Sequence, residues 1–181
     1  DGVETVWDRY EMQQPPCKYC ANGLSCARCA MGPCRIIPGM RDRGVCGADA
    51  DLIVSRNLLD TIATGAAAHS DHGRDIVETL LKTATGEAEG YSIRDEEKLR
   101  ALAAEWGIRM EGGEMPAIAH ALAMEMLEEF GTLKNRLQFA KRAPEKTQAI
   151  WNELGIFPRS VDREVVEAMH RIQMGVGADY T

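Results

Sequence analysis

The sequence predicts a mainly α-helical fold in which a cysteine-rich loop precedes a domain of several helices. All six cysteines lie between residues 17 and 46, and residues 47–181 contain none. After residue 48, helix-capping residues and glycines bound a series of segments without the polar–apolar alternation of strands. We therefore divide the chain into an N-terminal helical arm (1–16), a cysteine-rich segment (17–48) and a helical domain (49–181).

Composition limits the class of protein. The chain has 181 residues, 45% of them hydrophobic, which is enough for one packed core. Its formal charge of −7 argues against a nucleic-acid partner. No apolar run approaches the roughly 18 residues of a transmembrane segment, and "DGVETVWDRYEMQQPP" lacks the features of a signal peptide. We expect a cytoplasmic protein, free or peripheral to a membrane complex, whose given sequence is part of a longer chain.

The cysteine spacing fits two common explanations poorly. Disulfides suit small secreted proteins whose cysteines staple the whole fold, whereas these cysteines gather at one end. Zinc ribbons usually separate their two C-x2-C pairs by about 15 to 20 residues, but only five residues lie between the pair that starts at Cys17 and the pair that starts at Cys26. Zinc would also leave Cys34 and Cys46 without a role. Both explanations stay as less favoured alternatives.

An iron–sulfur cluster explains the pattern better. Four cysteines have the spacing C-x2-C-x4-C-x11-C, namely Cys26, Cys29, Cys34 and Cys46. Four thiolates must converge on a [4Fe–4S] cluster, so the chain has to curl tightly around it. Gly32, Pro33 and Gly47 suit such a curl, because glycine permits a positive φ and proline lacks an N–H donor. Arg35 is either a group that tunes the cluster or an ordinary surface side chain.

Cys17 and Cys20 remain after these four are assigned. Two thiolates do not complete a [4Fe–4S] or a [2Fe–2S] cluster, each of which usually takes four. In a two-fold symmetric dimer the same patch meets itself across the axis, so two cysteines from each subunit would hold one shared cluster. The sequence thus predicts a homodimer with a subunit-bridging cluster.

The longest helical segment begins at Asp49 or Asp51, either of which can cap it, and ends at Gly86. Its length favours two helices with a break near Gly65 or Gly73.

Four shorter helical segments follow. One opens on Ser92, three residues before Asp95, which is close to a capping box. Another begins with Pro116, a residue suited to a first helical turn. The predicted segments are 92–107, 116–131, 143–155 and 160–175.

Two histidines on the longest segment suggest a second site. His69 and His72 are three residues apart and are therefore neighbours on one helical face, where Asp75 and Glu78 continue at the same step. Imidazole titrates near neutral pH, so such a ladder can pass protons. From the residues alone, a surface helix with two incidental histidines is the better explanation.

Three stretches resemble a known family. Two of them, "YEMQQPPCKYCANGLSCARCAMGPCRI" and "GVCGADADLIVSRNLLDTIATGAAAHSDH", closely resemble the N-terminal part of the anaerobic nickel-containing carbon monoxide dehydrogenases. A third, "VDREVVEAMHRIQMGVGADY", resembles the end of that family's first, helical domain. The resemblance implies the N-terminal domain fold of the carbon monoxide dehydrogenase and hybrid-cluster superfamily. The family's subunit is far longer, and later domains hold its catalytic nickel–iron–sulfur cluster.

The resemblance carries over to individual cysteines. It implies that the subunit's own [4Fe–4S] cluster is held by Cys26, Cys29, Cys34 and Cys46. Cys17 matches the first ligand of the cluster that the two subunits share. Many family members place the second bridging ligand where this sequence has Ser25, so we take Cys20 as its replacement. This departure leaves the bridging cluster as either [2Fe–2S] or [4Fe–4S].

The resemblance also changes the interpretation of the histidines. His69 matches a histidine near the nickel site that acts in acid–base steps, and His72 matches the next member of a histidine relay. Asp75 and Glu78 stand where some members continue with histidines, so the implied proton path includes His69 and His72 only.

The function implied by the resemblance is enzymatic. The chain would be the electron-relay and dimer-forming domain of an oxidoreductase that interconverts CO plus water with CO2, two electrons and two protons. Electrons would pass from the nickel site through the [4Fe–4S] cluster to the bridging cluster, and then to a ferredoxin or a hydrogenase-type acceptor. A free-standing ferredoxin-like electron carrier and a hybrid-cluster protein remain alternatives, although hybrid-cluster proteins have a sparser N-terminal cysteine pattern.

Overall fold

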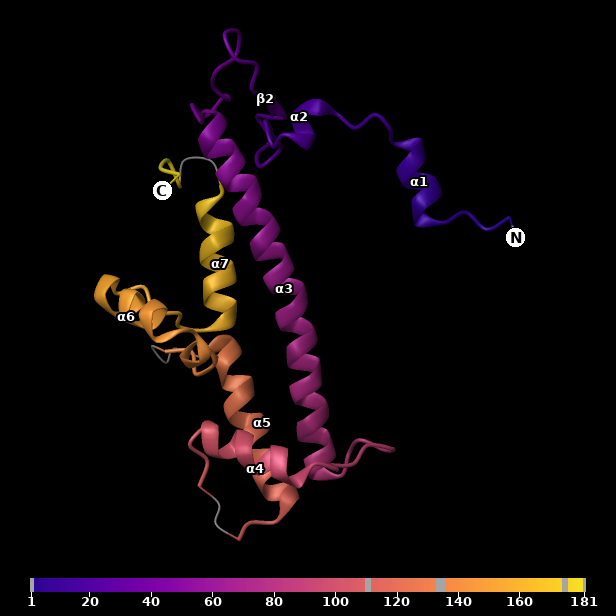
Figure 1. Ribbon diagram of the computed structural model, residues 1–181, viewed down its shortest axis with the longest axis vertical. Coiled ribbons are helices and arrows are strands. Elements are labelled where there is room, and N and C mark those ends of the chain that lie inside the picture. Colours follow the sequence, from indigo (N-terminus) through magenta and orange to yellow (C-terminus); the bar gives the residue numbers. More distant parts are fainter. Residues whose placement is uncertain (1, 110–111, 133–135, 174–175, 181) are drawn as a thin grey trace. The chain divides into compact units, whose positions relative to one another are not determined.

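The computed structural model describes residues 2–109, 112–132, 136–173 and 176–180, and it is mainly helical, as the sequence predicts (Figure 1). The chain forms two compact units. We call residues 1–62 together with 168–181 the cysteine unit, and residues 63–167 the helical unit. The earlier division into an arm, a cysteine-rich segment and a helical domain stays a prediction.

The cysteine unit begins with short elements. They are α1 (Val6–Met12), α2 (Lys18–Ala21), β1 (Ser25–Cys26) and β2 (Cys34–Arg35). α1 starts with a capping box, in which the Asp8 N–H donates to Thr5 Oγ1 at 3.3 Å and the Thr5 N–H donates to Asp8 Oδ2 at 2.7 Å. β1 and β2 pair antiparallel, with Cys26 opposite Cys34.

A small core fixes the segment around β1 and β2 on the start of α3 (Ala50–Thr85). Its buried residues are Ile36, Ala48, Leu52 and Ile53. The Asn57 side chain on α3 adds two hydrogen bonds, because its Nδ2 donates to the carbonyl oxygens of Gly23 at 3.0 Å and Ser25 at 2.9 Å. Figure 1 shows α2 and β2 beside this first part of α3. The loop that carries the cysteines is therefore anchored on a helix.

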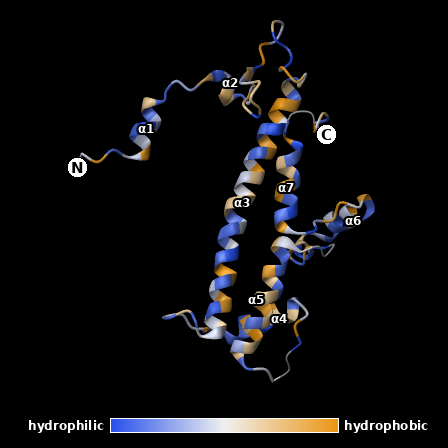
Figure 2. Cartoon of the chain, turned by 180° about the vertical axis from the view of Figure 1, so that it is seen from behind, coloured by the Kyte–Doolittle hydropathy of each residue, from blue (hydrophilic) through white to orange (hydrophobic). Residues whose placement is uncertain are grey.

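α3 is a single helix of 36 residues, so the predicted break near Gly65 or Gly73 is wrong. Neither glycine has a positive φ, and one glycine in a helix costs only about 1 kcal/mol relative to alanine. Asp49 caps the helix as predicted, because its Oδ1 accepts the Leu52 N–H at 3.0 Å. Gly86 ends it with a φ of +79°. Figure 2 shows hydrophobic residues recurring among polar ones along α3.

The helical unit contains the remaining elements. They are α4 (Glu96–Glu105), α5 (Met115–Gly131), the 3-10 helix η1 (Phe139–Arg142), α6 (Glu145–Leu154) and most of α7 (Val161–Arg171). The four helices match the four predicted segments, although α5 begins one residue earlier, at Met115, and Pro116 lies in its first turn. Ser92 does not cap α4; Asp95 does, accepting the Lys98 N–H at 2.9 Å. Among the described helices, none is both long and apolar enough to cross a membrane.

α4 and α5 pack together around the larger core of this unit. The core residues are Leu99, Ala103, Ile118, Ala119 and Leu122. Small side chains at Ala103 and Ala119 allow the two helices to approach closely.

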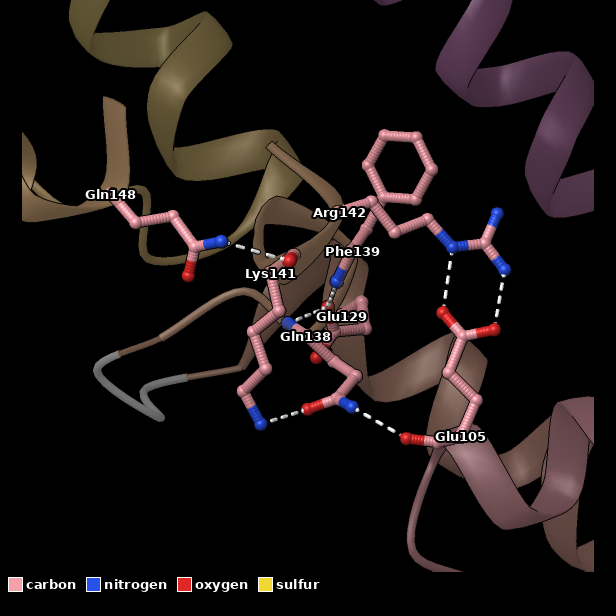
Figure 3. Close-up of polar contacts among 7 residues, drawn as sticks. All are labelled: Glu105, Glu129, Gln138, Phe139, Lys141, Arg142 and Gln148. Atoms are coloured by element: carbon pink, nitrogen blue, oxygen red, sulfur yellow. Dashed lines mark hydrogen bonds and ion pairs between the residues drawn. The ribbon is translucent and has the colours of Figure 1, made fainter. Parts of the chain in front are cut away.

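Polar contacts hold η1 against α4 and α5 (Figure 3). The Arg142 guanidinium donates to both oxygens of the Glu105 carboxylate, at 2.6 and 2.7 Å. The backbone N–H groups of Gln138 and Phe139 donate to Glu129 Oε2, at 2.5 and 3.3 Å. The Arg142 guanidinium keeps the pKa of Glu105 below its ordinary value.

Candidate metal centre

Four of the six cysteines line one cavity in the cysteine unit. They are Cys26, Cys29, Cys34 and Cys46. Strand pairing brings the first and third together, because Cys26 lies opposite Cys34 in the β1–β2 ladder. Cys29 lies in the loop that joins these strands, and Cys46 lies just before α3. The structure therefore gathers the four thiols that the sequence predicted to act together.

Two glycines allow this loop to close. At Gly32 an added Cβ would lie 3.1 Å from the Cys26 carbonyl oxygen and 3.3 Å from the Cys34 nitrogen, so a side chain would crowd the backbone between two of the thiols. Gly47, directly after Cys46, has a φ of +89°, which favours glycine. The predicted roles of these two glycines thus differ: Gly32 permits a close approach, and Gly47 permits a left-handed backbone.

Donor groups point at two of the four sulfurs. The Val45 N–H donates to Cys34 Sγ at 3.5 Å, and Arg56 Nη1 donates to Cys46 Sγ at 3.8 Å. The Ala48 N–H lowers the pKa of the Cys46 thiol, burial opposes this shift, and the Arg56 guanidinium adds to the lowering. Donors of this kind stabilise negative charge on a sulfur.

The residues present fit a [4Fe–4S] cluster. Such a cluster takes four cysteine thiolates, and each thiolate binds a different iron, so the sulfurs surround the cluster and do not meet at one point. All six cysteines are free thiols. Within the part of the chain that the structure describes, no three His, Cys, Asp or Glu side chains are close enough to hold a single metal ion. Four thiols around one cavity, with N–H donors beside them, are the set that a cluster requires.

Two arginines also line the cavity, and Arg35 is not one of them, which favours the second of its two interpretations, an ordinary surface side chain. Arg28 and Arg56 are lining residues, whereas Arg35 is exposed and lies over the Tyr19 ring, with 5.5 Å from its Cζ to the ring centroid. Arg56 follows the buried Leu52 by one helical turn, and this spacing was the available signal that its side chain faces inward.

Cys17 and Cys20 lie apart from the cavity lining. Both are exposed; Cys17 precedes the first turn of α2, and Cys20 lies within it. The backbone N–H groups of Cys20 and Tyr19 lower the pKa of the Cys17 thiol. The Ser25 hydroxyl donates to Cys20 Sγ at 3.2 Å. The structure therefore brings Ser25 and Cys20 into contact, although five positions separate them in the sequence.

His69 and His72 lie on the part of α3 that belongs to the helical unit, and both are exposed. Their three-residue spacing on a continuous helix makes them neighbours on one face. Asp71, between them, lies 3.7 Å from Arg74, as measured from its Oδ1 to the arginine Nε.

The sequence profile of the Prismane/CO dehydrogenase family matches residues 24–181. The chain belongs to the Prismane/CO dehydrogenase family. This membership agrees with the predicted resemblance and covers every helix from α3 onward.

Individual members of this family are similar along almost the whole chain. Carbon monoxide dehydrogenase 1 of Methanosarcina mazei is 51% identical over 100% of this chain. The Ni-free crystal structure of carbon monoxide dehydrogenase from Thermococcus sp. AM4 covers 99% of it, with a TM-score of 0.91 and 47% identity. A structure of acetyl-CoA synthase/carbon monoxide dehydrogenase, described with NiZn[Fe4S4] and NiNi[Fe4S4] clusters in its alpha subunits, covers 98%, with a TM-score of 0.91 and 34% identity. The chain spans 29%, 29% and 27% of these three proteins, respectively.

Proposed function

We propose that this chain is the electron-relay and dimer-forming part of an anaerobic, cytoplasmic carbon monoxide dehydrogenase, which interconverts CO plus water with CO2, two electrons and two protons. One observation carries the proposal. In a member of the Prismane/CO dehydrogenase family, four cysteines from separate parts of the loop line a single cavity. The similarity to proteins named carbon monoxide dehydrogenase over the whole chain supports the activity.

Cys26, Cys29, Cys34 and Cys46 would hold a [4Fe–4S] cluster in this cavity. When bound, such a cluster accepts and releases single electrons. The chain's own contribution is to supply the thiolates and to donate N–H groups from Val45 and Arg56 to their sulfurs. These donors stabilise the additional negative charge of the reduced state.

Cys17 and Cys20 would hold a [2Fe–2S] or [4Fe–4S] cluster together with the same pair from a second copy of the chain. Their exposure supports this role, because a shared ligand must reach the dimer interface. The contact between Ser25 and Cys20 also supports it, since Cys20 lies beside the position that holds a bridging ligand in many family members. A ferredoxin or a hydrogenase-type protein would be the electron acceptor.

His69 and His72 would transfer protons for a nickel–iron–sulfur cluster held by parts of the enzyme beyond this chain. The family resemblance, together with their neighbouring positions on one face of α3, supports this role. Since general acid–base groups contribute about 10²–10⁴-fold to rates, we expect His69→Gln to lower CO oxidation by a factor in that range. Iron and nickel contents should stay at the wild-type level, and an unchanged rate would remove His69 from the mechanism.

Metal analysis of the full-length protein, purified anaerobically, tests the proposal. Iron, acid-labile sulfide, zinc and nickel would be measured in the wild type and in Cys29→Ala. From the ligand counts we expect about four irons for the cavity, and about one or two more per chain for half of a bridging cluster. Additional iron with nickel identifies the dehydrogenase, and Cys29→Ala should lose the irons of the cavity. Iron without nickel would indicate an electron carrier, and zinc without sulfide would overturn the proposal.

A further inference from the structure

We propose that Arg56 is a positioning residue that raises the reduction potential of the cluster held at the four-cysteine cavity. The inference rests on the proposed function, because it assumes that the cavity holds a cluster. Arg56 lies on the first part of α3, and only 6% of its surface is exposed. It lines the cavity next to Cys46, one of the proposed ligands.

The hydrogen bonds of Arg56 point its charge at a ligand sulfur. Nη1 donates to Cys46 Sγ at 3.8 Å, and Nη2 donates to the Gly177 carbonyl oxygen. Nε is buried and has no hydrogen-bond partner among the residues that the structure describes. Burial of a guanidinium is unfavourable unless negative charge lies close by. A thiolate at Cys46 and the sulfides of a cluster would provide that charge and an acceptor for the unpaired N–H.

Two other arginines near the cysteines are placed differently. Arg28 lines the same cavity, but its Nη1 lies 2.6 Å from Asp60 Oδ1, so a carboxylate already neutralises its charge. Arg35 is exposed, and its guanidinium lies over the Tyr19 ring. Water screens an exposed charge far more than a buried one. Of these three arginines, Arg56 is therefore expected to act most strongly on the cluster.

The direction of the effect follows from charge. Reduction adds one negative charge to the cluster, and a nearby guanidinium stabilises the reduced form more than the oxidised form. Hydrogen bonds to sulfur and solvent exposure are established determinants of cluster potential. Arg56 should thus make the cluster easier to reduce and better able to take up an electron.

The test is a redox titration of the full-length protein, followed by the EPR signal of the reduced cluster. Loss of a signal in Cys29→Ala assigns it to the cavity. In Arg56→Gln we expect the equilibrium constant for reduction to fall about tenfold, which corresponds to about 59 mV for a one-electron couple. Arg56→Lys keeps the charge but lacks the guanidinium geometry, and it should show a smaller decrease. Arg35→Gln, which changes an exposed arginine next to Cys34, should leave the potential within error of the wild type.

Iron and sulfide contents separate this proposal from the one on which it rests. Wild-type protein without iron and sulfide would reject the proposed function itself. Full iron content in Arg56→Gln with an unchanged potential would reject only the role of Arg56. If Arg56→Gln loses iron, Arg56→Met, which also removes the charge, is titrated in its place, and a wild-type potential there overturns the proposal. Loss of iron from both variants overturns it too, because Arg56 would then be needed for assembly and not for tuning.

Discussion

Gly47 shows how one backbone angle shapes the candidate metal centre. It follows Cys46 directly and has a φ of +89°, and an added Cβ would meet no atom within 4 Å. Gly47→Ala should therefore add backbone strain of about 1 kcal/mol without any steric clash. Because this strain falls next to a proposed ligand, we expect less iron per chain after anaerobic reconstitution. Iron per chain and the midpoint of thermal unfolding are the measurements.

Gly39→Ala is a matched control for this variant. Gly39 also has a positive φ, +75°, and open space around it, but it does not line the cavity. The control should lower thermal stability by a similar amount while keeping the iron content of the wild type. Equal iron loss in both variants would contradict a specific role for Gly47.

Only the part of the candidate site that depends on the spacing of residues in the sequence could be predicted. Cysteine spacing was enough to group Cys26 with its three partners, and the structure places all four around one cavity. The approach of Arg56 to Cys46 depends on how α3 packs against the loop, and spacing alone does not encode it. The two alternatives for Arg35 stayed open because its position after Cys34 does not fix its direction, and adjacent residues in a strand point to opposite faces.

The long helix α3 leads to a prediction at the level of elements. Gly65 and Gly73 have helical backbones, and an added Cβ would meet nothing within 4 Å at either position. Alanine should stabilise the helix at each site by about 0.5–1 kcal/mol. Hydrogen exchange of the α3 amides should therefore slow in Gly65→Ala and Gly73→Ala.

Gly86→Ala should have the opposite effect on hydrogen exchange in the same helix. Gly86 has a φ of +79° where the helix ends, so alanine there should speed exchange in the last turn. Faster exchange around residue 65 or 73 in the first two variants would show that these glycines serve a bend that α3 adopts in solution.

The contact between α4 and η1 should depend on pH. Arg142 lowers the pKa of Glu105 in the folded protein (Figure 3). The stabilisation is therefore complete above the ordinary carboxyl pKa and is lost as the pH falls through the lowered value. We expect Glu105→Gln to remove this acid-dependent part of stability, as measured by hydrogen exchange in η1 at a series of pH values. Arg142→Gln should have the same effect, and the double variant should add nothing further; additive effects would contradict the pairing.

The ends of the helices could be predicted because the interactions that begin or end a helix are made between residues close in the sequence. Asp49 and Pro116 occur where the sequence placed them, since a cap or a first turn involves only a few neighbouring residues. The break in α3 was wrong because a single glycine does not remove a backbone hydrogen bond. The strands β1 and β2 were missed because two residues are too short to show an alternating pattern.

At the scale of the whole molecule, the exposed cysteines of α2 lead to a prediction about assembly. If Cys17 and Cys20 hold a cluster shared between two copies, Cys17→Ser/Cys20→Ser should lose about one iron per chain for a [2Fe–2S] cluster, or about two for a [4Fe–4S] cluster. The irons of the four-cysteine cavity should stay, because none of its lining cysteines changes. Native mass spectrometry should show a weakened dimer, since two ligands per subunit no longer join the copies.

Cys29→Ala is the converse control, which should lose the cavity irons and keep the dimer. A double variant that retains every iron would show that these thiols are not ligands, and one that loses iron from the cavity as well would show that the two sites do not assemble independently.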